Sequence, residues 1–251
     1  MPHIVDITEK MKKIRLDKLI ADKLGISRKQ SRVLIYTSQV LVNGKIEIHI
    51  DAQVSRQDNV VCQGNTIEFS EGFVYYILHK PEGYITADKD KFHKTVMELL
   101  PVYFSKEKIM PVGRLDIDTT GLLLFTNHGA LAYRLLSPKR KIYKTYIAKI
   151  DRKITQEDID AFAKGLDLGD FTSQPAELAM LDVSQNLVSV TLHEGKFHQV
   201  KRMFEAVSAS VLTLHRQSFG PLQLDIPVGA YKQCSQEEVQ SLFTACAMKE
   251  E

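Results

Sequence analysis

The stretch GRLDIDTTG, residues 113 to 121, concentrates charged side chains directly before an apolar segment, LLLF. It places Arg114, Asp116 and Asp118 in a polar loop, and residues that act on a substrate are often carried on loops that a rigid strand holds. A carboxylate in such a loop can serve as a nucleophile or as a general base. The same residues also suit a turn in which aspartate and threonine side chains hydrogen-bond to the backbone.

Two further stretches mix polar and apolar residues in a way that permits chemistry. The sequence KTY at 144–146 opens a predicted strand, where Tyr146 is also compatible with an ordinary half-buried strand aromatic. The sequence HQVKRMF at 198–204 has its apolar residues on one face of a predicted helix. On that pattern alone, Lys201 belongs to the solvent-exposed face.

Cofactor and metal motifs are missing from the sequence. It contains no G-x-x-x-x-G-K-[ST] loop, no G-x-G-x-x-G turn and no G-x-S-x-G elbow. The segment HEGKFH at 193–198 resembles a zinc-protease motif, but its histidines are one residue too far apart and Gly195 weakens the helix that the motif requires. We therefore expect chemistry that uses side chains alone, with no cofactor and no metal.

The first 70 residues show the pattern of a compact unit of two short helices and small strands. Helical spacing of apolar residues covers 16–24 with Gly25 as a C-terminal stop, and Ser27 can cap a second helix that runs to about Tyr36. A strand at 40–42 precedes a hairpin turn at Asn43-Gly44, and isoleucines then alternate from 46 to 50. Further strand segments at 60–61 and 66–69 flank a turn at Gly64-Asn65.

Basic residues are concentrated in the same region. From Lys10 to Arg32 the chain has nine basic and two acidic residues, a net charge of 9 − 2 = +7, although the whole chain is only +2. A second basic run covers 139–141 and continues to Lys144. Clustered positive charge attracts phosphates, although each run also suits an ordinary solvated face.

A polar break at 70–72 is the expected boundary, and it separates a unit at 1–70 from one at 73–251. The expected strands of the second unit lie at 73–78, 121–126, 144–150, 187–192 and around 210–214; the expected helices lie at 94–100, 129–137, 155–164, 198–207 and 235–245. Thr155 and Ser235 each precede an acidic residue by three positions, as in a capping box. Strands and helices do not alternate regularly, which favours a mixed α+β sheet over a doubly wound parallel one.

The cysteines and the N-terminus indicate a compartment. Cys62, Cys234 and Cys246 form no CxxC pair and are odd in number, which argues against a disulfide framework and a zinc finger and fits a reducing compartment. The first residues lack the apolar core of a signal peptide, and no segment approaches the roughly 20 apolar residues of a membrane span. We expect a cytoplasmic protein without a membrane partner.

Taken together and in order, the motifs resemble the pseudouridine synthases of the RsuA type. The resemblance covers about residues 14 to 243 and rests on GRLDIDTTGLLLFT, KTY and EGKFHQVKRMF, with HKPEGY at 79–84 matching the family's entry into its catalytic domain. The opening RLDKLIADKLGISRKQSRVLI with VLVNGKI resembles the small RNA-binding domain of ribosomal protein S4. The expected fold is therefore α+β: an S4-like domain followed by a catalytic domain with a mixed, mainly antiparallel sheet flanked by helices.

The resemblance implies roles for individual residues. Asp116 matches the aspartate on which the family depends, Tyr146 the tyrosine that packs on the target uracil and is proposed to take the proton from C5, and Lys201 the basic residue that pairs with the aspartate. The residues expected to contact the substrate are Arg114, Val200, Lys80 and Arg202. The residues expected to bind RNA through the N-terminal domain are Arg15, Lys18, Arg28, Lys29 and Arg32.

The implied reaction is the isomerisation of a specific uridine to pseudouridine in ribosomal RNA. The nearest resemblance is to enzymes of small-subunit (16S) rRNA, and the implied partner is that RNA in a pre-ribosomal particle, bound by a monomer. Relatives that modify large-subunit (23S) rRNA share the architecture, so this alternative stays open. A non-catalytic rRNA-binding or ribosome-assembly protein is a second alternative, against which the intact set of Asp116, Tyr146 and Lys201 argues.

Overall fold

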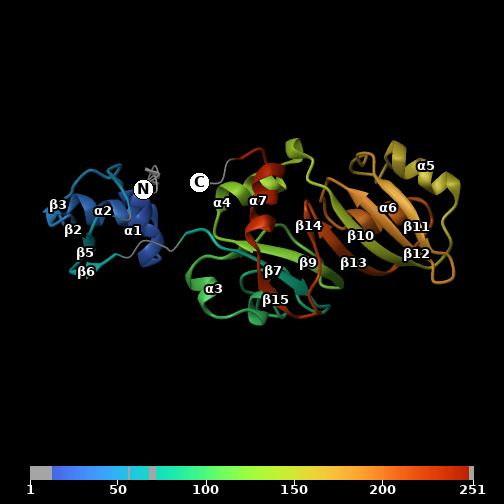
Figure 1. The fold of residues 1–251 in the computed structure, drawn as a ribbon, viewed down its shortest axis with the longest axis horizontal. Helices are drawn as coiled ribbons and strands as arrows, with labels where there is room; N and C mark the ends of the chain where they lie inside the picture. Colours follow the sequence, from blue (N-terminus) through green and yellow to red (C-terminus); the bar gives the residue numbers. More distant parts are fainter. Residues whose placement is uncertain (1–12, 56, 68–71, 249–251) are drawn as a thin grey trace, which may run out of the picture. The chain divides into compact units, whose positions relative to one another are not determined.

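The computed structural model describes residues 13–55, 57–67 and 72–248 (Figure 1). The chain divides after Gly72 into two compact units, each with a core of its own. The helices of the described residues are all too short and too polar to cross a membrane.

The N-terminal unit packs two helices against short strands. Helix α1 (Leu16–Leu24) ends at Gly25, which has a left-handed backbone, and α2 (Arg28–Tyr36) begins with a capping box between Ser27 and Gln30. Both helices confirm the sequence prediction. The strands are β1 (Ile14–Arg15), β2 (Val40–Val42), β3 (Lys45–Ile46), β4 (Gln53–Val54), β5 (Val60–Cys62) and β6 (Asn65–Thr66).

One strand of this unit is shorter than the isoleucine alternation predicts. The order of the four-stranded sheet is β3-β2-β5-β6. Strand β3 pairs with β2 only as far as Ile46. Ile46 and Ile48 are 61% and 48% exposed, so this alternation does not mark a buried strand face. The prediction of strand as far as Phe69 reaches residues 68 and 69, which lie outside the described part.

The second unit is built on a nine-stranded sheet. Its main path runs β11-β12-β10-β13-β9-β7-β15, with β14 on β13 and β8 on β9, and β9–β13 is the parallel pair among the described strands. This confirms a mixed, mainly antiparallel sheet. The strands are β7 (Tyr75–Lys80), β8 (Met110–Pro111), β9 (Thr119–Thr126), β10 (Lys144–Ile150), β11 (Glu177–Asp182), β12 (Leu187–Leu192), β13 (Val211–Phe219), β14 (Leu222–Gln223) and β15 (Tyr231–Gln233).

Helices cover both faces of this sheet (Figure 1). One core cluster contains side chains from α5 (Gln156–Lys164) and α6 (Gln199–Ala206), and the other contains side chains from α4 (Gly129–Leu136) and α7 (Gln236–Ala245). The short elements are η1 (Val96–Leu99), α3 (Tyr103–Lys106) and η2 (Pro138–Arg140). The predicted caps at Thr155 and Ser235 are confirmed, whereas the helix expected at 94–100 is a single 3₁₀ turn.

Candidate active site

The loop that carries Asp116 connects β8 to β9 and is fixed on both sides of that residue. Thr86 Oγ1 donates to the carbonyl of Leu115 at 2.9 Å and accepts from its N–H at 3.0 Å. The N–H of Gly83 donates to the carbonyl of Ile117 at 2.8 Å, and Leu115 itself is buried in the core. The backbone around Asp116 is therefore held while its carboxylate projects away from the sheet.

Lys80 adds a third attachment and corrects an expectation. The side chain is fully buried, and Nζ donates to the carbonyls of Pro81, Ile117 and Thr119 at 3.1, 3.4 and 2.8 Å. Burial lowers the pKa of Lys80 to about 8, against the opposing charges of Asp118 and Asp116. Lys80 therefore stabilises the loop around Asp116 through its backbone carbonyls, and its side chain is not part of the pocket lining.

Gly121, the last residue of the GRLDIDTTG motif, has a steric role. It has φ +113° and lies opposite Arg216, where β9 and β13 pair in parallel. A Cβ at this position would lie 2.3 Å from the carbonyl oxygen of Arg216. Because only glycine allows the two strands to approach this closely, the motif fixes the strand that immediately follows the Asp116 loop.

Tyr146 is the third residue of β10, in the middle of the sheet. It pairs with Val190 on β12 and with Arg216 on β13, and 8% of the residue is exposed. Side chains alternate across a strand, so Tyr146 shares its face with Ala148, which lies in the core under α6. The phenol ring is thus held rigidly at the edge of the core, where it also lines the pocket.

The start of α6 forms the opposite wall of the pocket, and the segment before it is cross-braced. The Gln199 side chain accepts from the N–H of Lys196 at 2.9 Å and donates to the Glu194 carboxylate at 2.7 Å. Glu194 also accepts from the N–H of Gln174 at 2.9 Å. His198 precedes the helix in a left-handed conformation with φ +49°, which histidine adopts more readily than most residues.

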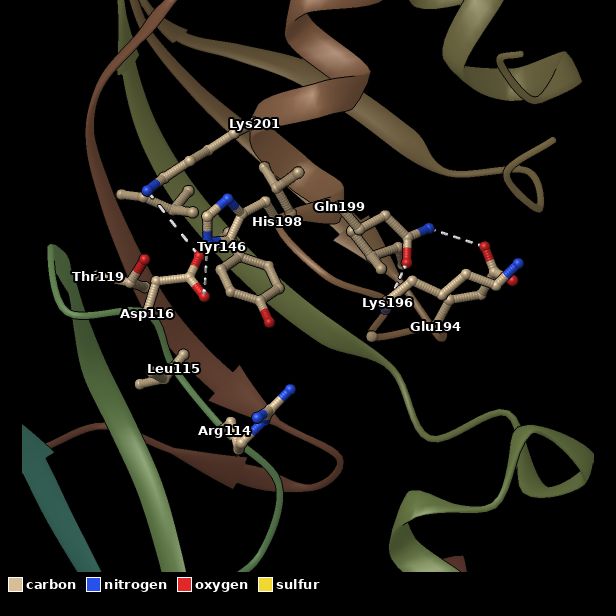
Figure 2. A pocket seen from close by; sticks show the side chains of 14 residues that line it. Arg114, Leu115, Asp116, Thr119, Tyr146, Glu194, Lys196, His198, Gln199 and Lys201 are labelled. Atoms are coloured by element: carbon tan, nitrogen blue, oxygen red, sulfur yellow. Dashed lines mark hydrogen bonds and ion pairs between the residues drawn. The ribbon is translucent and has the colours of Figure 1, made fainter. Parts of the chain in front are cut away.

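These three elements meet at one small, open pocket (Figure 2). The loop before β9 contributes Arg114 and Asp116, β10 contributes Tyr146, and the start of α6 contributes Val200 and Lys201. Three motifs that are separated by 30 to 55 residues in the sequence therefore converge at one place. An ordinary turn at 113–121 and a solvent-exposed Lys201 do not account for this arrangement.

The cations around Asp116 differ from the expected simple pair. Lys201 Nζ lies 3.9 Å from Asp116 Oδ2, but it hydrogen-bonds to both oxygens of Asp118 at 2.6 and 2.7 Å. His198 Nε2 lies 3.7 Å from the other Asp116 oxygen. Lys201 thus has Asp118 as its hydrogen-bonded partner, and it reaches Asp116 by charge across a longer gap.

Electrostatics at this end of the pocket favour the ionised form of Asp118. Partial burial by itself raises the pKa of Asp118, but the hydrogen bonds and charge of Lys201 outweigh it, so the net pKa of Asp118 is lowered. Asp116 faces the N-terminal end of α6, where the helix dipole favours negative charge. The side chain of Asp116 is 31% exposed, so a substrate can reach it.

Arg202 is bonded to other parts of the protein, whereas Arg114 is exposed at the pocket. The Arg202 guanidinium donates to the carbonyl of Leu168 at 2.6 Å and pairs with Asp170. It braces α6 against the 167–171 loop and is not part of the pocket lining, and a contact of Arg202 with the substrate stays a prediction. Arg114 is exposed at the pocket and has no hydrogen-bond partner among the described residues, so it is available for a substrate.

The basic residues of the N-terminal unit divide into two kinds. Asp17 is completely buried and pairs with Arg15, Arg28 and Arg32 at 3.2, 2.6 and 3.1 Å, while each arginine side chain stays 41–45% exposed. Burial alone raises the pKa of Asp17, but the arginine hydrogen bonds outweigh it and hold that pKa well below its usual range. Lys18 and Lys29 are exposed, and no ion pair joins them to another described residue.

Sequence reasoning missed three residues of the site. Glu194, His198 and Gln199 belong to the motif EGKFHQVKRMF but are given no individual role by the sequence, and all three line the pocket. The available signal was the motif EGKFHQVKRMF, which contains them all. Asp118 was recognised as a polar loop residue, but the sequence does not show that it, and not Asp116, bonds to Lys201.

Comparison with known proteins agrees with this geometry. The sequence model of the family described as "RNA pseudouridylate synthase" matches residues 74–206, more than half of the chain. A solved structure described as "Crystal structure of pseudouridylate synthase" is 34% identical with a TM-score of 0.64, covering 91% of this chain and 99% of its own.

Relatives of similar length carry a more specific name. The "Ribosomal small subunit pseudouridine synthase A" of Vibrio vulnificus is 35% identical over 92% of this chain and 100% of its own length. The protein of the same name from Escherichia coli strain K12 is 37% identical over 91% of this chain and 100% of its own. The similarity thus covers both units and the link between them.

Proposed function

This chain belongs to the RNA pseudouridylate synthase family as an enzyme of the RsuA type, and we propose that its substrate is a specific uridine of small-subunit (16S) ribosomal RNA. The full-length relatives named for the small subunit support this choice. The same architecture is compatible with a large-subunit (23S) substrate, so the experiment below includes both RNAs.

The observation that carries the catalytic proposal is the convergence of Asp116, Tyr146 and Lys201 on one pocket. Pseudouridine formation breaks the N1–C1′ bond, turns the uracil and rejoins it through C5, so atoms are conserved and no redox group is required. Asp116 begins the reaction, and its ionised carboxylate suits either attack at C1′ or removal of the C2′ proton.

The remaining pocket residues have complementary roles. Tyr146 offers a ring face on which uracil stacks and a hydroxyl that relays the C5 proton to solvent after the base has turned, while N1 takes up a proton in exchange. Lys201 and Asp118 form a charged pair beside Asp116, with Lys201 Nζ 3.9 Å from the Asp116 carboxylate. Val200 is 6% exposed and gives the base an apolar wall. Arg114, exposed at the pocket, contacts phosphate or fills the gap that the flipped base leaves at a cost of a few kcal/mol.

The N-terminal unit, residues 1–70, is proposed to hold the RNA while residues 73–251 perform the chemistry. Three half-exposed arginines and two exposed lysines present positive charge on α1, α2 and the residue before α1. We expect this unit to bind rRNA in a pre-ribosomal particle in the cytoplasm, with the enzyme acting as a monomer.

Two measurements test the proposal. Tritium release from C5-labelled uridine in rRNA transcripts separates an enzyme from a non-catalytic binder, because the C5 hydrogen leaves only when pseudouridine forms. Pseudouridine mapping in both rRNAs from a deletion strain then identifies the site. Loss of a single 16S pseudouridine, restored by the wild-type gene, supports the proposal; loss of a 23S position instead contradicts the 16S assignment.

A further inference from the structure

Phe197 is an exposed aromatic residue next to the catalytic pocket. The residue is 67% exposed, although its neighbours His198 and Lys196 both line the pocket. Its ring stacks on the ring of His198 with centroids 3.8 Å apart and planes 18° from parallel. Because burying a large apolar ring is favourable, such a ring at a binding site indicates a surface that a ligand covers.

The stack is built into a rigid segment. Gln199 bonds to Lys196 on one side and to Glu194 on the other, which closes the 194–199 segment on itself. His198 takes a left-handed backbone immediately before α6, and this turn places its ring between Phe197 and Asp116. A ligand that stacks on Phe197 therefore meets a preorganised surface and orders little of the protein on binding.

The charges around the stack indicate the kind of ligand. Arg114 and Lys196 are both exposed cations at the pocket, and Lys196 Nζ lies 3.5 Å from the centre of the Phe171 ring. Aromatic faces next to a cationic groove are the combination that binds single-stranded nucleic acid, with bases on the rings and phosphates on the cations. A purely apolar ligand would gain nothing from the cations Arg114 and Lys196.

We propose that Phe197, supported by His198, is a stacking platform for the nucleobase adjacent to the target uridine. The inference rests on the proposed function. When the target base leaves its stack, each neighbouring base loses a partner, and an exposed aromatic ring replaces that partner. Phe197 is thus a positioning and specificity residue that stabilises the RNA conformation in which the uridine reaches Asp116.

The first test compares variants of Phe197 in the full-length enzyme. Phe197→Ala and Phe197→Leu raise KM for tritium release by about 5- to 150-fold, the value of one base–aromatic stack, and leave kcat unchanged. Phe197→Trp retains the wild-type KM. The leucine variant separates stacking from simple apolar contact, since it keeps the apolar side chain but has no ring.

A second variant and a matched control accompany these. His198→Asn keeps a residue that tolerates the left-handed backbone but removes the supporting ring, and it raises KM in the same direction. Tyr133→Ala removes an aromatic that is 77% exposed on α4, which packs on the opposite core, and leaves KM at the wild-type value. Thermal melts of all variants check that each is folded.

A double-mutant cycle that combines Phe197→Ala with a change in the RNA gives the decisive result. Transcripts carry an abasic nucleotide on the 5′ or the 3′ side of the target uridine. If one neighbouring base stacks on Phe197, removing it raises the wild-type KM but not the KM of Phe197→Ala, so the two losses are not additive. Additive losses on both sides, or equal KM values for Phe197→Ala and Tyr133→Ala, overturn the proposal. Absence of tritium release by the wild-type enzyme contradicts the proposed function instead.

Discussion

Each unit of this protein contains an aspartate with basic side chains around it, and the two sites are built differently. Asp17 is fully buried, and three arginines bond to it at 2.6 to 3.2 Å. Asp116 is 31% exposed, and its basic neighbours His198 and Lys201 stay 3.7 and 3.9 Å away. Beside it, Asp118 takes the short bonds from Lys201.

The difference shows what separates a carboxylate that stabilises the fold from one that is accessible to a substrate. Asp17 has its lone pairs occupied by arginines, which makes it a fixed centre that orders the helices around it. Asp116 receives attractive charge but not direct hydrogen bonds from these cations, so its oxygens stay available for a substrate. The loop backbone at Leu115 and Ile117 is clamped instead, which holds the reactive group in place without using it.

After Asp116 itself, the largest effect on the rate is expected for Tyr146. Tyr146→Phe keeps the ring that stacks on uracil and removes the hydroxyl, so kcat falls by about 10²- to 10⁴-fold, the usual contribution of a general acid–base group. RNA affinity stays at the wild-type value because charge and packing are unchanged. Single-turnover tritium release and filter binding measure the two quantities; a wild-type rate would remove the hydroxyl from the mechanism.

Variants of Lys201 test whether its charge, 3.9 Å from Asp116, contributes to activity without a short hydrogen bond. Lys201→Met removes the cation that lies next to both carboxylates, so the pKa of Asp118 rises. Activity falls, and the acid limb of the pH–rate profile moves to higher pH.

Asp118→Asn is the matched variant for Lys201. It keeps the lysine and frees it to face Asp116, so it costs less activity than Lys201→Met. If Asp118→Asn lost more activity than Lys201→Met, the carboxylate of Asp118 would itself be needed for the reaction. The contrast drawn between Asp116 and Asp17 would then fail.

Asp17 is expected to affect stability and not chemistry. Asp17→Asn destabilises the N-terminal unit by about 1.5–3 kcal/mol, the range for hydrogen bonds to charged groups. Since folding lowers the pKa of Asp17, its contribution is complete above the unfolded pKa of about 3.9 and is lost as the pH falls toward the folded value. Hydrogen exchange of α1 and α2 peptides in the full chain measures both effects. Unchanged acid sensitivity in the variant would argue against this role.

The smallest effects are expected for the two exposed lysines. Lys18→Ala and Lys29→Ala each reduce the salt dependence of rRNA binding by about 0.7–0.9 in the slope of log affinity against log salt, one phosphate contact each. Neither changes stability, because neither lysine has an ion-pair partner among the described residues. A salt titration beside Arg28→Ala, which loses both binding and stability, separates the two kinds of basic residue. If both variants showed the wild-type slope of log affinity against log salt, neither lysine would contact a phosphate.

The sequence predicts those parts of the fold that local physics determines. Helix α2 and helix α7 begin at capping boxes that can be identified from Ser27 and Ser235, and β10 matches its predicted bounds. Strand β11 was missed because it pairs only with β12 and exposes much of its length, so its alternation is weak.

The site is less predictable than the helices because its contacts are long-range. A lysine at the end of a strand is ordinarily exposed, and nothing in the sequence shows that Lys80 turns inward to three carbonyl groups of a distant loop. The same holds for the choice of Asp118 by Lys201, which depends on positions 83 residues apart. Motif resemblance identified the residues, but not which of them bond to each other.

The most direct test compares Asp116→Asn with Asp17→Asn in one set of assays. Tritium release at saturating rRNA and the binding constant are measured for both variants. We expect Asp116→Asn to lose at least about 10²-fold in rate while binding RNA like the wild type. Asp17→Asn should retain the wild-type rate at saturation. Activity of more than a few per cent in Asp116→Asn, or abolished chemistry in folded Asp17→Asn, would contradict the assignment of Asp116 as the reactive carboxylate.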